Sequence, residues 1–329
     1  QIVLATPSVG ATENAMLAAC GAEGDTVICN AAREPEIADL QEFLCAMGAQ
    51  VRGAGGSVIT VSPGRALHGC AHRVIPDRIV TATYLCAAAA AGGDITLRNT
   101  EHRQLAAVTT ALRQAGCRVD CGADYIRLTR TEPLRAVPPV QTTPYPGFPT
   151  DCQAIFMAAL LQSRGTTVFV ENIFQSRYRH VPELIRMGAD IRTEGRVAVV
   201  CGVERLHGAE VVATDLRGGA ALVTAGLAAE GITTVQGVYE SDLRGSLGTL
   251  ADQIDGAAGN AQTITDSLSK TLGDVSSMAA SAARSSDCFS YTEKSYTDCS
   301  AARCPFSRET EGRYRMAPPP SLTEISTLE

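Results

Sequence analysis

The sequence repeats one structural unit four times, and this repeat limits the possible folds more than any other feature. A marker glycine recurs at intervals of about 66–72 residues, at Gly24, Gly93, Gly165 and Gly231. An apolar segment of helical length precedes each glycine, and a short strand rich in β-branched residues follows it. A second helix and further strands come next in the first three units. Repeated helix–strand units of this kind predict an α/β fold.

The first helix of a unit has almost no polar face. Segments 77–91, 152–162 and 216–229 are apolar nearly all round, and such helices are buried on all sides. Segment 11–22 is predicted to be the corresponding buried helix of the first unit. We therefore expect helices inside and sheets outside, as an inside-out α/β barrel of repeated units. The second helices are predicted to end at Gly48, Gly116 and Gly188, because glycine readily adopts the left-handed conformation that ends a helix.

Composition excludes several classes of protein. The net charge of -7 gives no broad basic surface, so we expect no nucleic-acid partner. The apolar run 79–92 is too short to span a membrane, and we predict a cytoplasmic protein. Twelve cysteines lie in a long chain without a recognisable signal peptide, which indicates a reducing compartment rather than a disulfide scaffold. His68, Cys70 and His72 alternate along one predicted strand but lack further ligands, so no metal site is predicted.

Six strings, taken together, resemble one enzyme family. They are Pro7-Ser8-Val9-Gly10-Ala11-Thr12-Glu13-Asn14, Asn30-Ala31-Ala32-Arg33-Glu34-Pro35-Glu36-Ile37, Val74-Ile75-Pro76-Asp77-Arg78-Ile79, Phe148-Pro149-Thr150-Asp151, Arg177-Tyr178-Arg179-His180-Val181-Pro182-Glu183-Leu184 and Ala213-Thr214-Asp215-Leu216-Arg217. In this order and spacing they are similar to the UDP-N-acetylglucosamine enolpyruvyl transferases over about residues 1–244. One string alone would be a weak signal, whereas the ordered set is specific.

The resemblance implies a fold of six units in two domains around a cleft. Residues 1–73 would finish the first domain and residues 74–245 would form most of the second. The two other units, which carry the family's catalytic cysteine loop, have no counterpart here, so the chain is expected to be inactive alone. The implied reaction moves the enolpyruvyl group of phosphoenolpyruvate to the 3-hydroxyl of UDP-N-acetylglucosamine, in peptidoglycan synthesis. It needs no metal or organic cofactor.

The same resemblance suggests site residues in the first domain and in the third unit. Thr6, Pro7, Ser8, Val9 and Gly10 would contact the uridine nucleotide at a helix start, although Ser8 could also be an ordinary helix cap. Asp151 would be the base that accepts the proton of the sugar hydroxyl, and its alternative is again a helix cap. Ile173 would touch the nucleotide sugar, or else be a core residue at a strand end.

Charged residues complete the predicted site. Arg177, Asp215 and Arg217 are expected to bind substrate, and Arg244 is a candidate catalytic residue that grips phosphoenolpyruvate by resemblance. Arginine suits bidentate contacts with phosphate and carboxylate groups. An ordinary surface ion pair is the alternative for each arginine. Arg244 departs from the family string by one inserted residue.

The resemblance ends near residue 245. Residues 246–284 carry an apolar heptad-like seam that predicts a helix, and self-association through segment 247–282 is one use for it. Residues 285–329 are rich in Ser, Thr, Pro and Arg and are predicted to be disordered. A second functional class stays open from the sequence. It is a non-catalytic protein that uses the half-fold to bind a nucleotide-sugar or to assemble.

Overall fold

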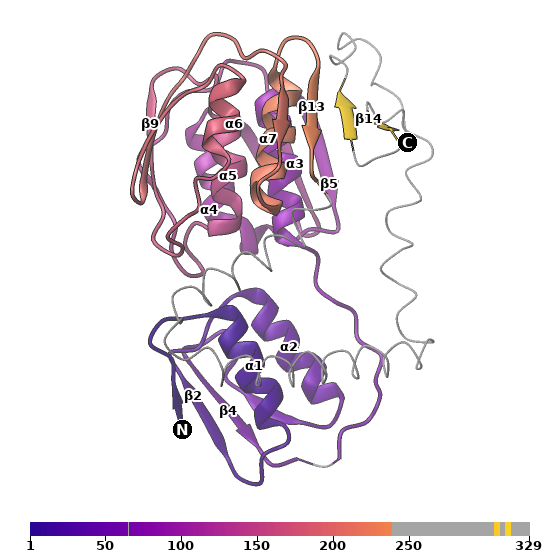
Figure 1. The fold of residues 1–329 in the computed structure, drawn as a ribbon. Helices are drawn as coiled ribbons and strands as arrows, with labels where there is room; N and C mark the ends of the chain where they lie inside the picture. The colour runs from indigo at the N-terminus through magenta and orange to yellow at the C-terminus, as the bar shows by residue number, and fades with distance from the viewer. Residues whose placement is uncertain (65, 239–305, 310–312, 317–329) are drawn as a thin grey trace.

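The protein forms two α/β domains joined by an extended segment (Figure 1). The computed structural model describes residues 1–64, 66–238, 306–309 and 313–316. The first domain ends with a strand at Ser62, and the second begins with a helix at Arg78. Segment 66–77 between them has no helix or strand, so His68, Cys70 and His72 do not alternate along a strand as predicted.

In the first domain, two helices pack against one sheet. The helices are α1 (Val9–Ala19) and α2 (Pro35–Ala46), and the strands are β1 (Ile2–Val3), β2 (Thr26–Cys29), β3 (Gln50–Arg52) and β4 (Val58–Ser62). The sheet order is β1-β2-β4-β3, with β1 and β2 parallel and the other pairs antiparallel. Met16, Ile28, Ile37 and Ile59 form its fully buried centre.

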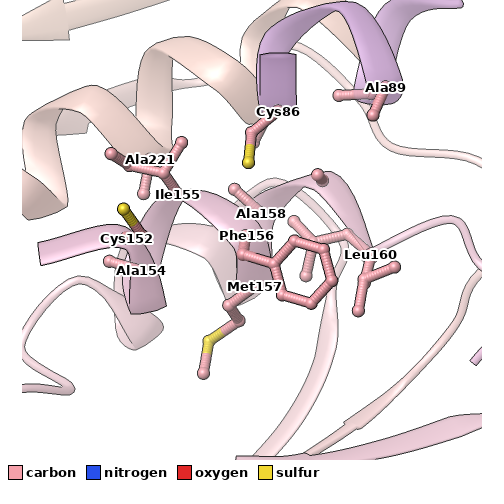
Figure 2. Packing of buried hydrophobic residues seen from close by; sticks show 14 of the residues in the cluster. Cys86, Ala89, Cys152, Ala154, Ile155, Phe156, Met157, Ala158, Leu160 and Ala221 are labelled. Carbon is pink, nitrogen blue, oxygen red and sulfur yellow. The ribbon is translucent and has the colours of Figure 1, made fainter. Parts of the chain in front are cut away.

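In the second domain, three helices lie together in the interior. They are α3 (Arg78–Ala91), α5 (Thr150–Ala159) and α7 (Leu216–Ala228), and each contacts the other two. From Cys152 onward α5 is buried at every position. Figure 2 shows its Ile155, Phe156 and Ala158 beside Cys86 of α3 and Ala221 of α7. The predicted arrangement of inner helices and outer sheets is confirmed here.

Three separate sheets surround this helical core. Their strands are β5 (Gly93–Arg98), β6 (Arg118–Cys121), β7 (Tyr125–Arg130), β8 (Val140–Gln141), β9 (Thr166–Val170), β10 (Asp190–Glu194), β11 (Val197–Cys201), β12 (Glu210–Val212), β13 (Thr233–Gln236), β14 (Phe306–Glu309) and β15 (Arg313–Met316). The orders are β5-β7-β6, β10-β11-β9-β8 and β12-β13-β15-β14. Within the described residues these sheets do not close into a barrel.

The second helices of the middle units lie where the repeat predicts them. They are α4 (Ala106–Gln114), which follows a 3₁₀ turn at His102–Leu105, and α6 (Val181–Arg186). The predicted left-handed glycines after the second helices are confirmed, with φ of 101° at Gly48, 107° at Gly116 and 95° at Gly188.

Two expectations about burial are wrong. Helix α3 leaves Val80 44% and Tyr84 55% exposed on one face, because no described element covers that side. Helix α1 buries only Thr12, Met16 and Ala19. It packs on α2 and its own sheet, whereas the inner helices of the second domain also have two helical neighbours.

Part of the C-terminal segment joins the fourth unit. Strand β15 pairs antiparallel with both β13 and β14, so residues 306–309 and 313–316 add two strands to the sheet of β12 and β13. The predicted helix over 246–284 lies outside the described residues. Within the described part of the chain, no helix is long and apolar enough to cross a membrane.

Candidate active site

A cavity of about 740 Å³ lies between the two domains. Its size is in the usual range of small-molecule sites, about 300–1,000 Å³. Both domains and the segment that joins them contribute to its wall. The lining residues used below are Thr6, Pro7, Ser8, Val9, Gly10, Glu13, Glu34, Glu36, Asp77, Arg78, Tyr145, Thr150, Asp151, Ile173, Phe174 and Arg217.

The first turns of five helices meet at this cavity. Residues from the starts of α1, α2, α3, α5 and α7 all belong to its wall. Ser8 caps α1 by accepting from Ala11 N, and Asp77 caps α3 by accepting from Ile79 N and Val80 N. Helix N-termini carry partial positive charge and free N–H groups. Their convergence favours an anionic ligand.

Asp151 lies between two arginines in the first turn of α5. Arg177 Nη2 donates to Asp151 Oδ1 at 2.6 Å, and Arg217 Nε donates to the same oxygen at 3.0 Å. Among the described residues no group hydrogen-bonds to Oδ2. That oxygen can therefore accept a hydroxyl from a ligand, while the two arginines fix the orientation of the carboxylate.

A short turn after β9 carries the next part of the wall. Ile173 is 38% exposed and Phe174 is 49% exposed, and both line the cavity. The guanidinium of Arg177 lies 4.8 Å from the centre of the Phe174 ring, which adds a cation–π contact to its ion pair with Asp151. The turn and the carboxylate are thus linked through one arginine.

The first domain supplies an acidic wall. Glu36 forms a two-point contact with Arg78, and Glu34 Oε1 accepts from Tyr145 N at 3.3 Å, so both carboxylates bind the second domain. Burial raises the pKa of Glu13, and the nearby Glu36 carboxylate raises it further. An anionic ligand would consequently be drawn toward Arg177 and Arg217, which flank Asp151, and toward the start of α1.

The predicted site residues divide into three groups. Thr6, Pro7, Ser8, Val9, Gly10, Asp151, Ile173 and Arg217 line the cavity. Arg177 and Asp215 lie behind the wall: Arg177 bonds to Asp151, and Asp215 Oδ1 caps α7 by accepting from Gly218 N at 2.8 Å. Arg244 lies outside the described residues.

Several residues that line or support the cavity were not singled out from the sequence. Asp77 and Arg78 belong to a string that carried the resemblance, as do Glu34 and Glu36, but these residues were given no role. Tyr145 and Phe174 had no motif to mark them. The completely buried Glu171 also escaped notice. The sequence did offer one sign of it, because Glu171 directly follows an apolar strand. An acidic residue is seldom buried at such a position unless it has hydrogen-bond or charge partners.

Known proteins similar to this chain cover most of its length. Residues 1–242 match the family model described as EPSP synthase (3-phosphoshikimate 1-carboxyvinyltransferase). The chain belongs to the EPSP synthase family. Within this family it is 50% identical over 242 residues to UDP-N-acetylglucosamine 1-carboxyvinyltransferase 2 of Caldanaerobacter subterraneus, covering 74% of this chain and 58% of the relative. The UDP-N-acetylglucosamine 1-carboxyvinyltransferase of Zymomonas mobilis is 52% identical over 235 residues, covering 71% and 55%.

Solved structures of the family have the same fold. The enolpyruvyl transferase NikO from Streptomyces tendae aligns with a TM-score of 0.63 and 27% identity, over 70% of this chain and 55% of that protein. An EPSP synthase from Acinetobacter baumannii aligns with a TM-score of 0.54 and 22% identity, over 78% and 62%, and supports the fold alone. The chain therefore spans little more than half the length of these family members.

Proposed function

We propose that this chain forms one part of an enolpyruvyl transfer site, with UDP-N-acetylglucosamine as acceptor and phosphoenolpyruvate as donor. The observation that carries the proposal is the pairing of Asp151 with Arg177 and Arg217 at a cavity where five helices begin. Relatives about half identical to this chain bear the name of that activity. As part of the same proposal, we place the protein in the cytoplasm.

The chemistry assigned to these residues follows from their positions. Asp151 accepts the proton of the sugar 3-hydroxyl through Oδ2, and the hydroxyl oxygen bonds to C2 of phosphoenolpyruvate. The vinyl carbon C3 takes up a proton in this step and releases one in the next, when the C2–O bond to phosphate breaks. Arg217 and the helix N-termini stabilise the anionic groups during both steps. The α1 turn from Thr6 to Gly10 binds the nucleotide, beside Ile173.

A chimera tests this function directly. Residues 1–242 replace the matching segment of the Caldanaerobacter relative, which supplies all remaining parts of its own chain. We expect phosphate release from phosphoenolpyruvate that depends on UDP-N-acetylglucosamine. Residues 1–329 alone are expected to bind UDP-N-acetylglucosamine in calorimetry without turnover. A folded chimera that releases no phosphate, together with a chain that binds no nucleotide-sugar, would contradict the proposal.

A further inference from the structure

Glu171 is a completely buried carboxylate directly behind the wall of the cavity. Its Oε1 accepts from Ile173 N at 2.9 Å and from Phe174 N at 3.0 Å. Its Oε2 accepts from Thr150 Oγ1 at 3.0 Å. Every one of these donors belongs to a residue that lines the cavity.

The surroundings of Glu171 are unusual for a buried acid. Among the described residues no arginine forms an ion pair with it, and all three donors are neutral groups. A buried carboxylate is costly unless hydrogen bonds replace its water. Here two backbone N–H groups and one hydroxyl do so, and Thr150 begins α5, whose N-terminus adds partial positive charge. An apolar residue at this place would leave all three donors without a partner.

The two oxygens reach the proposed base by different routes. Oε2 holds Thr150, the chain neighbour of Asp151. Oε1 holds the turn that carries Phe174, and the Phe174 ring lies against Arg177, which bonds to Asp151. Ile173, predicted to touch the nucleotide sugar, lies in the same turn. One carboxylate therefore connects the start of α5 to the turn after β9.

We propose that Glu171 is a positioning residue. It fixes the position of the turn at 173–174 relative to the start of α5 and does not touch the ligand. Its effect on nucleotide-sugar binding rests on the proposed function, whereas its effect on the turn does not. A satisfied buried network of this kind is rigid, so the wall keeps its shape before a ligand arrives.

Amide hydrogen exchange on the ligand-free chain tests the positioning role. Glu171→Ala is expected to speed exchange of the Ile173 and Phe174 amides by about tenfold or more, because both amides lose their buried acceptor and the space left by the side chain admits water. In Glu171→Gln the side-chain oxygen still accepts from both amides. The new NH₂ group can donate to the Thr150 hydroxyl, so exchange should return close to the wild-type rate.

Thr167→Val is the matched control. Thr167 is buried on β9, the strand that ends just before Glu171, and its Oγ1 accepts from Val137 N at 3.1 Å, away from the cavity. This variant should lose a similar amount of stability and leave the two amides protected. Unchanged exchange of Ile173 and Phe174 in Glu171→Ala would overturn the positioning role. Equal acceleration of both amides in Thr167→Val would overturn it as well, because the effect would then be general loosening.

The second part of the test measures the affinity of the same variants for UDP-N-acetylglucosamine by calorimetry. Glu171→Ala should bind about tenfold more weakly than wild type, with Glu171→Gln and Thr167→Val close to wild type. A wild-type chain that binds no nucleotide-sugar would count against the proposed function, while the exchange arm would still decide the role of Glu171. Wild-type affinity in a Glu171→Ala protein with freed amides would show that the turn does not shape the binding wall, and would overturn its link to the ligand.

Discussion

The carboxylate of Asp151 meets two guanidinium groups through a single oxygen. As a plain helix cap it would instead accept from backbone N–H groups of the first turn, as Asp77 and Asp215 do in α3 and α7. The side chain of Asp151 instead bonds to Arg177 and Arg217 at the cavity wall. Asp77 and Asp215 are the N-caps of α3 and α7 and serve structure. Asp151 lies further on, inside the first turn of α5, whose N-cap is Pro149, and its carboxylate is free for chemistry.

This difference can be tested with Asp151→Asn in the chimera described above. The amide keeps the shape of the side chain but cannot take the hydroxyl proton, so turnover should fall by about 10²–10⁴-fold. Asp190→Asn, at an exposed position of β10, is the control and should keep full activity. Phosphate release is the measurement. Turnover of the Asp151 variant near the control rate would show that another group is the base.

His180 predicts a dependence of stability on pH. The residue is fully buried, and burial lowers its pKa from 6.5 to about 4. The Asp215 carboxylate and a backbone hydrogen bond with Arg177 oppose this shift in pKa, and the charge of Arg177 adds to it. Between pH 6.5 and 4 the unfolded chain binds a proton that the folded chain does not bind. The free energy of unfolding should therefore fall as pH drops through this window, by at most about 1.4 kcal/mol per pH unit.

Denaturant unfolding of wild type and His180→Gln at pH 7.5, 6 and 5 measures this dependence. The variant should lose stability at every pH, but its curve should be flatter than that of wild type. His207→Gln, at an exposed position, should follow the wild-type curve. Parallel curves for wild type and His180→Gln would mean that His180 is not the group that titrates.

At the scale of elements, the end of α6 depends on glycine for two reasons. Gly188 has a φ of 95°, and a Cβ there would meet the His207 ring at 2.9 Å. Gly188→Ala should lower the free energy of unfolding by about 1–3 kcal/mol. Gly195→Ala is the matched control, because φ is 55° there and a Cβ would enter open space. Equal losses in urea titrations of the two variants would exclude the steric part of the explanation.

Helices and strands were more predictable from the sequence than their surroundings. The apolar run that begins at Cys152 and the glycine at 188 act locally, so the periodicity and the turn residue located α5 and the end of α6. Burial of α1 and α3 was overestimated, because it depends on how many neighbours an element finds. The pairing of Asp151 with Arg177 and Arg217 joins three elements far apart in sequence, and the family resemblance named these residues without predicting their contact. Glu171 escaped because hydrogen bonding, rather than a motif, defines its role.

At the scale of the whole molecule, the two domains hold each other at the base of the cavity. Glu36 and Arg78 form the contact from α2 to α3, and the Arg78 guanidinium also lies 5.8 Å from the centre of the Tyr145 ring. Arg78 is only 8% exposed, so this ion pair is shielded from solvent better than a surface pair. Dissolved salt therefore screens the attraction between the two charges less. The relative orientation of the cavity walls consequently depends on residues that also line it.

The pairing of β15 with β13 predicts that the C-terminal strands protect the fourth sheet. A chain ending at residue 305 would leave β13 with an unpaired edge. Amide exchange of Thr233–Gln236 should then accelerate, and the shortened chain should aggregate more readily. A chain ending at residue 316 keeps β14 and β15 and should behave as the full chain does. Equal exchange in the two truncated proteins would show that β15 contributes nothing to the sheet.

The order β12-β13-β15-β14 repeats that of β8-β9-β11-β10 with a far longer stretch of sequence between its second and third strands. Chain statistics make such a detour cheap, because each doubling of the length that must be closed costs only about 0.6 kcal/mol of entropy. The sheet thus brings together two segments that lie far apart in the sequence. A foreign sequence spliced in between β13 and β15 should accordingly leave the pairing of these two strands intact.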